Sequence, residues 1–297
     1  MPRSITVRAF AKINLDLRVL GVRPDGYHEL RTTFQSIALA DRLTFLPTRG
    51  PFRIECDDPA CPTDRRNLIW KAADLVSKHR KRRPSPFGVT VRVEKNIPMQ
   101  AGLGGGSTDA AASLRALCRL WNVRMPPAEL QHAARTLGAY VPYFLEGGTA
   151  LGFHRGDLLF PLDDIAPAWV VLVVPEFGVS TKDAFGWWDA AHKGRKGQDG
   201  RDGQDGRERR KGRDRRGQQA VSNDLQNVVA ARHPVVSRLV RALNKEGAFH
   251  ASLSGSGSAV FGLFWRRSDA QAAARVLAGP RTFVTPTISR RAYLAAK

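Results

Sequence analysis

A glycine-rich run at residues 95–109 constrains this chain more than any other segment, because it joins a strand pattern to a helix pattern through almost bare backbone. Before it, the valines of 89–93 alternate with polar residues, which predicts a strand with one buried face. From Ser107 onward, apolar residues recur at helical spacing. Four glycines within 102–106 leave backbone N–H groups uncovered at the start of that helix. A helix N-terminus of this kind favours an anion such as phosphate.

Two common phosphate-binding loops do not fit this run. A P-loop requires a lysine before its Ser/Thr, and here Ser107 follows Gly106 directly. The dinucleotide-binding fingerprint, counted from Gly102 and Gly104, requires a third glycine where this chain has Ser107. A flexible glycine linker is the remaining alternative, but a linker needs neither the preceding strand nor the alanine-rich helix that follows. The run therefore predicts a phosphate-binding loop of another kind.

The run resembles the ATP loop of the GHMP kinases, a superfamily that includes galactokinase, homoserine kinase and mevalonate kinase. Its form over residues 97–111 is similar to one branch, whose members phosphorylate a cytidine-diphosphate-linked methylerythritol in the non-mevalonate (MEP) route to isoprenoids. Further motifs of that branch occur in the same order along nearly the whole chain. These motifs lie at residues 11–15, 23–30, 67–69, 179–181, 222–225 and 253–261.

The resemblance implies an α+β chain with the two-domain GHMP kinase fold. Residues 1–158 would form an N-terminal ATP-binding domain similar to ribosomal protein S5 domain 2. Residues 159–297 would form a ferredoxin-like C-terminal domain, with both substrates meeting in the cleft between the two. Strand and helix patterns that are interspersed without regular βα alternation favour the same α+β class.

Local patterns predict most of the secondary structure directly. Asn67 is expected to cap the helix at 68–79, and Gly138 to end the helix at 128–137. The continuous apolar run 168–174 predicts a buried central strand. The other expected helices begin at 107 or span 227–233, 235–246 and 270–277. The other expected strands span 5–11, 15–20, 43–46, 89–93, 147–153, 249–254, 258–264 and 283–288.

The chain is strongly basic, with a net charge of +20. Residues 193–216 carry eleven Lys/Arg and five Asp/Glu and no apolar residue. Such a segment cannot bury enough surface to offset its ordering entropy, so we expect a disordered insertion at 193–219. An RNA-binding tract is the alternative, but the segment lacks aromatic residues for base stacking, and we expect no nucleic-acid partner. The remaining positive charge suits ATP and a nucleotide-linked substrate.

Nothing in the sequence indicates a membrane or secreted protein. No apolar run approaches 18 residues, and the N-terminus leads into a strand pattern without a signal peptide. The three cysteines suit a reducing compartment, so we expect a cytoplasmic enzyme. Cys56 and Cys61 have no partners at zinc-site spacing, and no metal site is predicted.

The resemblance assigns ATP binding to residues from both halves of the chain. Ser107 can cap the helix, or it can contact phosphate or the Mg²⁺ that ATP carries, and both alternatives stay open. Asn67 and Lys95 match family positions near the adenine and ribose. A second glycine loop at 255–257 would close on the phosphates. The implied ATP-binding residues are Asn67, Lys95, Pro98, Gly102, Leu103, Gly104, Gly105, Gly106, Ser107, Asp109, Gly255 and Gly257.

The resemblance places the other substrate on a different set of residues. Lys12 lies inside an apolar strand pattern, where a lysine is expected to face a cleft or to pair with an acid; an edge-strand lysine that faces water is the alternative. In the family this lysine stabilises the transferring phosphate, with Asn14 beside it. Tyr27 and His28 follow a turn signal and would bind the cytosine. Phe185 would cover that base from the other side, and Thr181 would lie at the nucleotide end of the cleft.

The chain departs from the family at the position of the catalytic base. The family has an aspartate in a Gly-Ala-Asp-Val-Pro-Phe-Phe segment, and residues 138–144 here read Gly-Ala-Tyr-Val-Pro-Tyr-Phe. Tyr140 therefore stands where the family has its aspartate. A tyrosine with a pKa of about 10 is a poor base at pH 7 and carries no charge to pair with Lys12.

Several alternatives follow from Tyr140. The chain can be a kinase that relies on its phosphate cradle, Mg²⁺ and Lys12, as homoserine kinases are thought to manage without this aspartate. It can also bind both ligands without transfer, or Asp109 or Asp157 can replace the missing base. We expect ATP-dependent phosphorylation of the substrate 2-hydroxyl with impaired or base-independent chemistry. A GHMP kinase for another small alcohol is a further alternative, against which the segment 24–28 argues.

Overall fold

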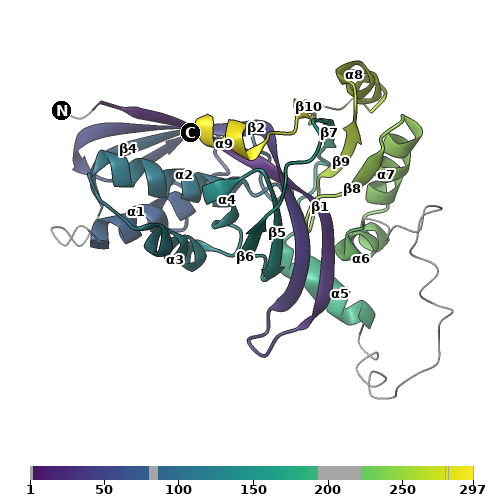
Figure 1. The fold of residues 1–297 in the computed structure, drawn as a ribbon, viewed down its shortest axis with the longest axis horizontal. Helices are drawn as coiled ribbons and strands as arrows, with labels where there is room; N and C mark the ends of the chain where they lie inside the picture. The colour runs from purple at the N-terminus through teal and green to yellow at the C-terminus, as the bar shows by residue number, and fades with distance from the viewer. Residues whose placement is uncertain (1–2, 80–85, 193–221, 278, 280, 297) are drawn as a thin grey trace.

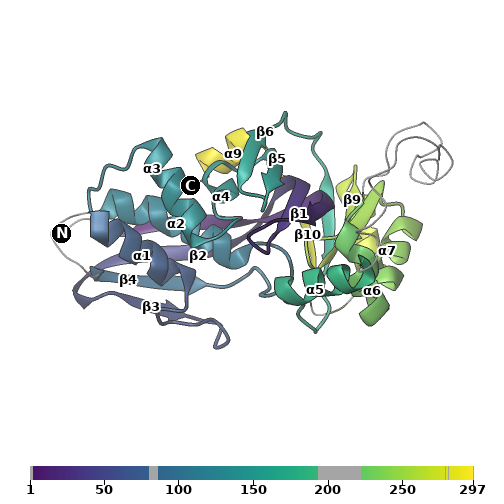
Figure 2. The ribbon, with the colours of Figure 1, turned by 90° about the horizontal axis from the view of Figure 1, so that it is seen from below.

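The computed structural model describes residues 3–79, 86–192, 222–277, 279 and 281–296. In this part of the chain, a six-stranded sheet and a four-stranded sheet follow each other along the long axis of the molecule, each covered by helices (Figures 1 and 2). The expected α+β class is therefore confirmed. The insertion at 193–219, for which we expect disorder, lies outside the described residues.

Two long antiparallel strands, β1 (Ile5–Val22) and β2 (His28–Pro51), form the base of the first sheet. The sequence predicts only fragments of them, because register shifts interrupt the alternation of buried and exposed residues in β1. One shift falls between Phe10 and Lys12 and another between Asn14 and Asp16, on either side of the expected catalytic lysine. The remaining strands are β3 (Arg53–Cys56), β4 (Phe87–Glu94), β5 (Thr149–His154) and β6 (Leu158–Pro161).

Helices pack on one face of this sheet (Figure 2). The expected helix at 68–79 is confirmed, and Asn67 Oδ1 caps it by accepting a hydrogen bond from Ile69 N at 2.9 Å. The alanines of 110–112 bring the next helix close to the sheet, and the two share one apolar core. The helices are α1 (Leu68–His79), α2 (Gly105–Leu120), α3 (Pro127–Leu137) and α4 (Tyr143–Glu146).

The second sheet is antiparallel, with strand order β10-β7-β9-β8. Its inner strand β7 (Trp169–Val173) occupies the central place predicted for the apolar run 168–174. The other strands are β8 (His250–Leu253), β9 (Val260–Phe264) and β10 (Thr282–Pro286). The helices of this half are α5 (Thr181–His192), α6 (Asp224–Arg232), α7 (Val235–Lys245) and α8 (Arg267–Val276). None of the described helices is long and apolar enough to cross a membrane.

The last helix, α9 (Arg290–Ala295), returns to the first half of the molecule and lies beside α4 (Figures 1 and 2). Its Tyr293 is fully buried and donates a hydrogen bond to Phe144 O at 2.9 Å. The ring covers Gly147, where a Cβ would lie 2.3 Å from the tyrosine. Chain segments about 150 residues apart therefore meet here, which no local pattern indicates.

Replacement of Gly147 by alanine tests this contact. Gly147 has a φ of +66°, so Gly147→Ala combines a left-handed backbone with a clash against a buried ring. We expect the free energy of unfolding to fall by about 2–4 kcal/mol in urea titrations. The control is Gly186→Ala in α5, where the added Cβ meets nothing within 4 Å. That variant should gain about 0.5–1 kcal/mol from helix propensity. Equal stability of the Gly147 variant and the parent protein would contradict the packing of α9.

Candidate active site

The first glycine loop opens helix α2. Gly104 is the N-cap residue, with a φ of +77°, and the helix begins at Gly105, two residues earlier than the sequence predicts. Ser107 therefore lies inside the first turn and caps nothing, so the capping alternative for it is wrong. A Cβ at Gly104 would lie 2.5 Å from the Phe144 ring, which explains why glycine is required there. The glycines that follow leave the helix N-terminus open to an anion.

The second glycine loop, residues 255–257, and the residues that flank it pack directly on the first. Ser254 Oγ donates a hydrogen bond to Gly102 O at 3.0 Å, and Ala259 N donates one to Ala101 O at 3.2 Å. A Cβ at Gly102 would lie only 2.0 Å from Ser254 O. Two loops that belong to different sheets thus form one continuous backbone surface, as the resemblance implies.

Lys12 lies where the two loops meet and is 2% exposed. Its Nζ donates hydrogen bonds to Gly102 O at 2.6 Å and to Asn14 Oδ1. A Cβ on Gly255 would be 3.3 Å from the same nitrogen. Among the described residues Lys12 forms no ion pair, and its burial lowers the pKa of the amine to about 7. The free amine and the ammonium ion therefore coexist near neutral pH.

Asn14 holds the lysine from the same strand. Its Oδ1 accepts from Lys12, while its Nδ2 donates to Thr32 Oγ1 at 2.7 Å. The Thr32 hydroxyl in turn donates to Asp16 O at 2.6 Å. This chain of hydrogen bonds crosses from β1 to β2 and fixes the amide of Asn14, so that its oxygen points at the amine.

Tyr140 is one of two aromatic residues that lie beside Lys12. The lysine Nζ lies 5.4 Å from the centroid of the Tyr140 ring and 5.8 Å from that of Phe34. The two rings contact each other edge to face, with centroids 5.7 Å apart. Burial raises the pKa of Tyr140 to about 12, so the phenol keeps its proton at neutral pH. The amine thus faces aromatic rings, which attract a cation far less than a carboxylate does.

The two aspartates that the sequence offers as alternative bases form ion pairs with other residues. Asp109 Oδ2 accepts a hydrogen bond from Lys95 Nζ at 2.9 Å. Asp157 pairs with Arg155 at 3.2 Å. In the described part of the chain neither aspartate pairs with Lys12, so the structure gives no support to this alternative.

Lys95 is the centre of a buried group of charges that sequence reasoning misses. Besides Asp109, it pairs with Asp41, which is fully buried and also accepts hydrogen bonds from Asn96 N at 2.6 Å and Ile97 N at 2.8 Å. Burial lowers the pKa of Lys95, but the two carboxylates outweigh this effect and raise it. Burial also raises the pKa of Asp109 to about 7, against the effect of Lys95. Asp41 connects β2 to the start of the glycine loop, and no pattern around it in the sequence indicates that role.

Asn223 is a second residue whose role the sequence does not reveal. Its Oδ1 caps helix α6 by accepting from Leu225 N at 2.9 Å. Its Nδ2 donates to Leu253 O at 2.9 Å and to Gly255 O at 2.7 Å. It therefore ties α6 to the second glycine loop.

A cavity of about 520 Å³ runs along the two loops. Gln100, Arg66 and Ser256 also line it and were not expected. Asn14, Tyr27, His28 and Gly257 are expected site residues that do not line it. The expected residues that do line it are Lys12, Asn67, Lys95, Pro98, Gly102, Leu103, Gly104, Gly105, Gly106, Ser107, Asp109, Tyr140, Thr181, Phe185 and Gly255. Most of the predicted residues are therefore brought together at one place.

The residues expected to bind the cytosine lie at the start of β2 and in α5. His28 is buried and shares a hydrogen bond of 2.9 Å with Asp189 Oδ1. Its ring stacks directly on Phe185, with centroids 4.5 Å apart, so there is no space for a base between these two rings. Tyr27 is 57% exposed, and the Arg155 guanidinium lies 5.1 Å from its ring centroid. The open aromatic surface is thus that of Tyr27, and Asp189 joins the site unpredicted.

Comparison with known families identifies the fold that builds this site. The sequence pattern of the GHMP kinases N terminal domain matches residues 67–148, and that of the GHMP kinases C terminal domain matches residues 207–280. The first glycine loop lies in the former match and the second loop in the latter. The chain is a GHMP kinase homologue with both conserved domains of that superfamily.

Relatives narrow the assignment. The 4-diphosphocytidyl-2-C-methyl-D-erythritol kinase of Moorella thermoacetica is 41% identical over 290 residues, which cover 96% of this chain and 99% of that protein. The enzyme of the same name from Solibacter usitatus is 40% identical and covers 99% of this chain and 92% of its own length. The chain belongs to the 4-diphosphocytidyl-2-C-methyl-D-erythritol kinase family.

Solved structures agree with this assignment. A crystal structure of 4-(cytidine 5'-diphospho)-2C-methyl-D-erythritol kinase superposes with a TM-score of 0.77 at 32% identity, over 95% of this chain and 99% of that chain. A homoserine kinase from Cytophaga hutchinsonii superposes with a TM-score of 0.63 at 19% identity, over 97% and 96% of the two chains. The second likeness shows the shared fold alone.

The buried charges around Lys95 give a stability prediction. Asp41→Ala removes one of the two carboxylates that pair with Lys95. It also leaves two backbone N–H groups without their acceptor. We expect the free energy of unfolding to fall by about 3–5 kcal/mol, as for other broken buried ion pairs. The matched control is Glu55→Ala, which breaks the exposed Glu55–Arg92 pair and should cost less than about 1 kcal/mol. Urea titrations at pH 7 measure both, and similar losses in the two variants would contradict the assigned role of Asp41.

Proposed function

We propose that this chain transfers the γ-phosphoryl group of ATP to the 2-hydroxyl of 4-diphosphocytidyl-2-C-methyl-D-erythritol, a step of isoprenoid precursor biosynthesis, and that it does so in the cytoplasm. The observation that carries the proposal is the position of Lys12, held at the junction of two glycine loops on the wall of the cavity. The family to which the chain belongs supports the choice of substrate.

The site contributes positioning and charge to the transfer. The bond between the γ-phosphorus and its bridging oxygen breaks as the bond to the substrate oxygen forms, and negative charge spreads over the transferring group. Backbone N–H groups at the start of α2 can hold the phosphates, and the Lys12 ammonium can stabilise the transferring group. Tyr140 holds its own proton, so the hydroxyl proton passes to water or to the transferred phosphate. We therefore expect a slow kinase.

Mg²⁺ enters this proposal with ATP. Asp109 is the only acidic residue among the described residues that line the cavity. Its Oδ1 is buried and has no hydrogen-bond partner in the described part of the chain. Carboxylate and hydroxyl oxygens suit magnesium, so Asp109 and the nearby Ser107 are the side chains that would hold the ion or its water ligands. The ion would offset negative charge on the phosphates.

The cytidine end of the substrate would bind near Tyr27. The exposed ring of Tyr27, next to Arg155, offers a flat surface and a positive charge for a base and a diphosphate. His28 and Asp189 hold each other at the start of β2, on the side towards Phe185. Thr181 lies near the second glycine loop, with its Oγ1 3.3 Å from Ser256 Oγ.

A second candidate function is binding without transfer. Tyr140 favours it, because the residue places a neutral, protonated side chain where the resemblance expects a base. Such a chain would bind ATP and the cytidine compound and would form no phosphorylated product.

The replacement of Tyr140 by aspartate distinguishes these functions. We expect slow product formation by the parent protein and a kcat about 10²–10⁴-fold higher for Tyr140→Asp, since a positioned base contributes a factor of this size. Transfer of labelled phosphate from ATP in the presence of Mg²⁺ measures both.

Tyr140→Phe is the matched control and should leave kcat within a few-fold of the parent, because the phenol is not the base. An unchanged or lower kcat for Tyr140→Asp would refute the account of the missing base. If the parent and Tyr140→Asp are both folded, bind ATP and form no product, then either another alcohol is the substrate or binding without transfer is the function.

The pH dependence of kcat/KM reports the state of Lys12. With a pKa of about 7, the parent amine loses its charge as the pH rises, so kcat/KM should fall above about pH 7. In Tyr140→Asp a carboxylate faces the amine and stabilises the ammonium ion, so the fall should move to higher pH. Lys12→Arg keeps its charge over the whole range and should show no such fall. The same alkaline limb in the parent and in Tyr140→Asp would mean that another group causes it.

A further inference from the structure

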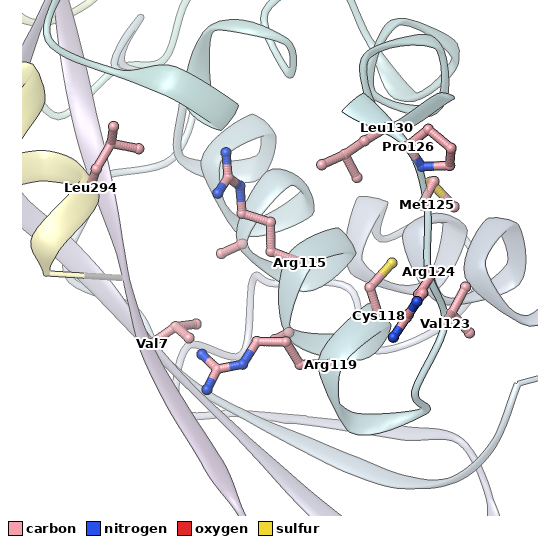
Figure 3. Close-up of a pocket in the computed structure, with 12 residues that line it drawn as sticks. Val7, Arg115, Cys118, Arg119, Val123, Arg124, Met125, Pro126, Leu130 and Leu294 are labelled. Atoms are coloured by element: carbon pink, nitrogen blue, oxygen red, sulfur yellow. The ribbon is translucent and has the colours of Figure 1, made fainter. Parts of the chain in front are cut away.

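A second cavity lies at the other end of helix α2. Its volume is about 590 Å³, similar to that of the active-site cavity. Its walls come from the C-terminal half of α2, the segment that follows, the start of α3, and single residues of β1 and α9 (Figure 3). The lining residues fall into an apolar set and a set of three arginines. No residue lines both cavities among those described.

Most of the lining of this cavity is apolar. Leu294 of α9 is 44% exposed, although it is a large aliphatic side chain, and with Leu130 of α3 it flanks the side chains of α2 (Figure 3). Val7, Val123 and Met125 add further apolar surface. A cavity of this size with a mostly apolar wall is typical of sites for small organic molecules.

The charged lining residues are all arginines. Arg115, Arg119 and Arg124 line the cavity, and no acidic residue does so among those described. None of the three forms an ion pair in the described part of the chain. The C-terminal end of a helix favours a basic residue and so accounts for Arg119, but Arg115 lies mid-helix and Arg124 lies beyond the end. The arrangement therefore leaves positive charge without a partner beside an apolar wall.

The side chain of Arg115 is held in place by one hydrogen bond, and one of its other donors has no acceptor among the described residues. Its Nη2 donates a hydrogen bond to Leu145 O, which ties the side chain to α4. Its Nε is buried and has no hydrogen-bond partner among the described residues. An unsatisfied buried donor costs free energy. The hydrogen bond to Leu145 O holds the guanidinium group of Arg115 at the wall of the cavity.

We propose that this cavity is a binding site for an organic phosphate, an anion whose phosphate group contacts an arginine of the lining while its hydrocarbon body lies on the apolar wall. A planar guanidinium group binds phosphate through paired hydrogen bonds, and the three groups lie at different places along the cavity wall (Figure 3). The apolar wall provides the preference for a ligand with a hydrocarbon body over inorganic phosphate. The site is separate from the one that binds ATP.

Octyl phosphate is a suitable probe of this site. Titration calorimetry would use the full chain with its active site filled by a non-hydrolysable ATP analogue, and the probe below its micelle concentration. We expect saturable binding of one molecule. Octyl glucoside, which has the same tail without charge, and inorganic phosphate, which has no tail, should each bind at least tenfold more weakly.

Variants localise the binding. Arg119→Gln combined with Arg124→Gln should weaken octyl phosphate binding at least tenfold. The matched control is Arg135→Gln, which removes an exposed arginine of α3 that does not line the cavity and should leave the affinity unchanged. Circular dichroism and thermal melting confirm that each variant is folded. No binding of octyl phosphate, equal affinity for inorganic phosphate, or equal losses in the double variant and in the Arg135 control would overturn the proposal.

Discussion

The contact between Lys12 and the backbone of the first glycine loop is the interaction on which the rest of the site depends. The carbonyl of Gly102 accepts from the lysine and also from Ser254, so a single oxygen joins β1, the first loop and the second loop. Glycine is required at 102 and 104 because backbone and a buried ring approach these positions too closely for any Cβ. The glycines that leave N–H groups free for phosphate are thus also required by the packing. The same packing determines where the lysine lies.

Among the described residues no carboxylate pairs with Lys12, and this determines the electrostatics of the site. A buried amine with an acidic partner stays charged well above neutral pH, whereas this one faces Tyr140 and Phe34 and has a pKa of about 7. Lys95, which is comparably buried, shows the opposite case, since Asp41 and Asp109 keep it charged. The two lysines differ in their partners rather than in their burial. The phosphates of ATP would supply the missing negative charge, so nucleotide binding itself would favour the ammonium form of Lys12.

Much of the fold and the site can be predicted from local sequence patterns. The features that cannot be predicted in this way depend on contacts between residues far apart in the sequence. The helix at 68–79, its cap at Asn67 and the central strand near 168–174 are confirmed, because each arises from spacing within one segment. The long strands β1 and β2 are recognised only in part, since register shifts break their alternation. Helix α9 and the roles of Asp41 and Asn223 require residues far apart to meet, and no periodicity encodes that. The glycine loop is predicted, but its helix begins earlier, because a left-handed glycine rather than Ser107 ends the loop.

Helix α2 connects two regions that favour anions for different physical reasons. At its N-terminus the preference comes from backbone N–H groups and the helix dipole, which no side-chain substitution removes. At its other end the dipole is unfavourable to an anion, so any anion held there depends on the guanidinium groups of Arg115, Arg119 and Arg124. Charge changes at the arginines should therefore leave the phosphate loop intact, since the alanine-rich body of α2 is buried between them and the loop. The net positive charge of the chain attracts anions to its whole surface. Only a cavity with an apolar wall can also prefer a ligand that has a hydrocarbon body. This preference separates a specific site from a positively charged surface.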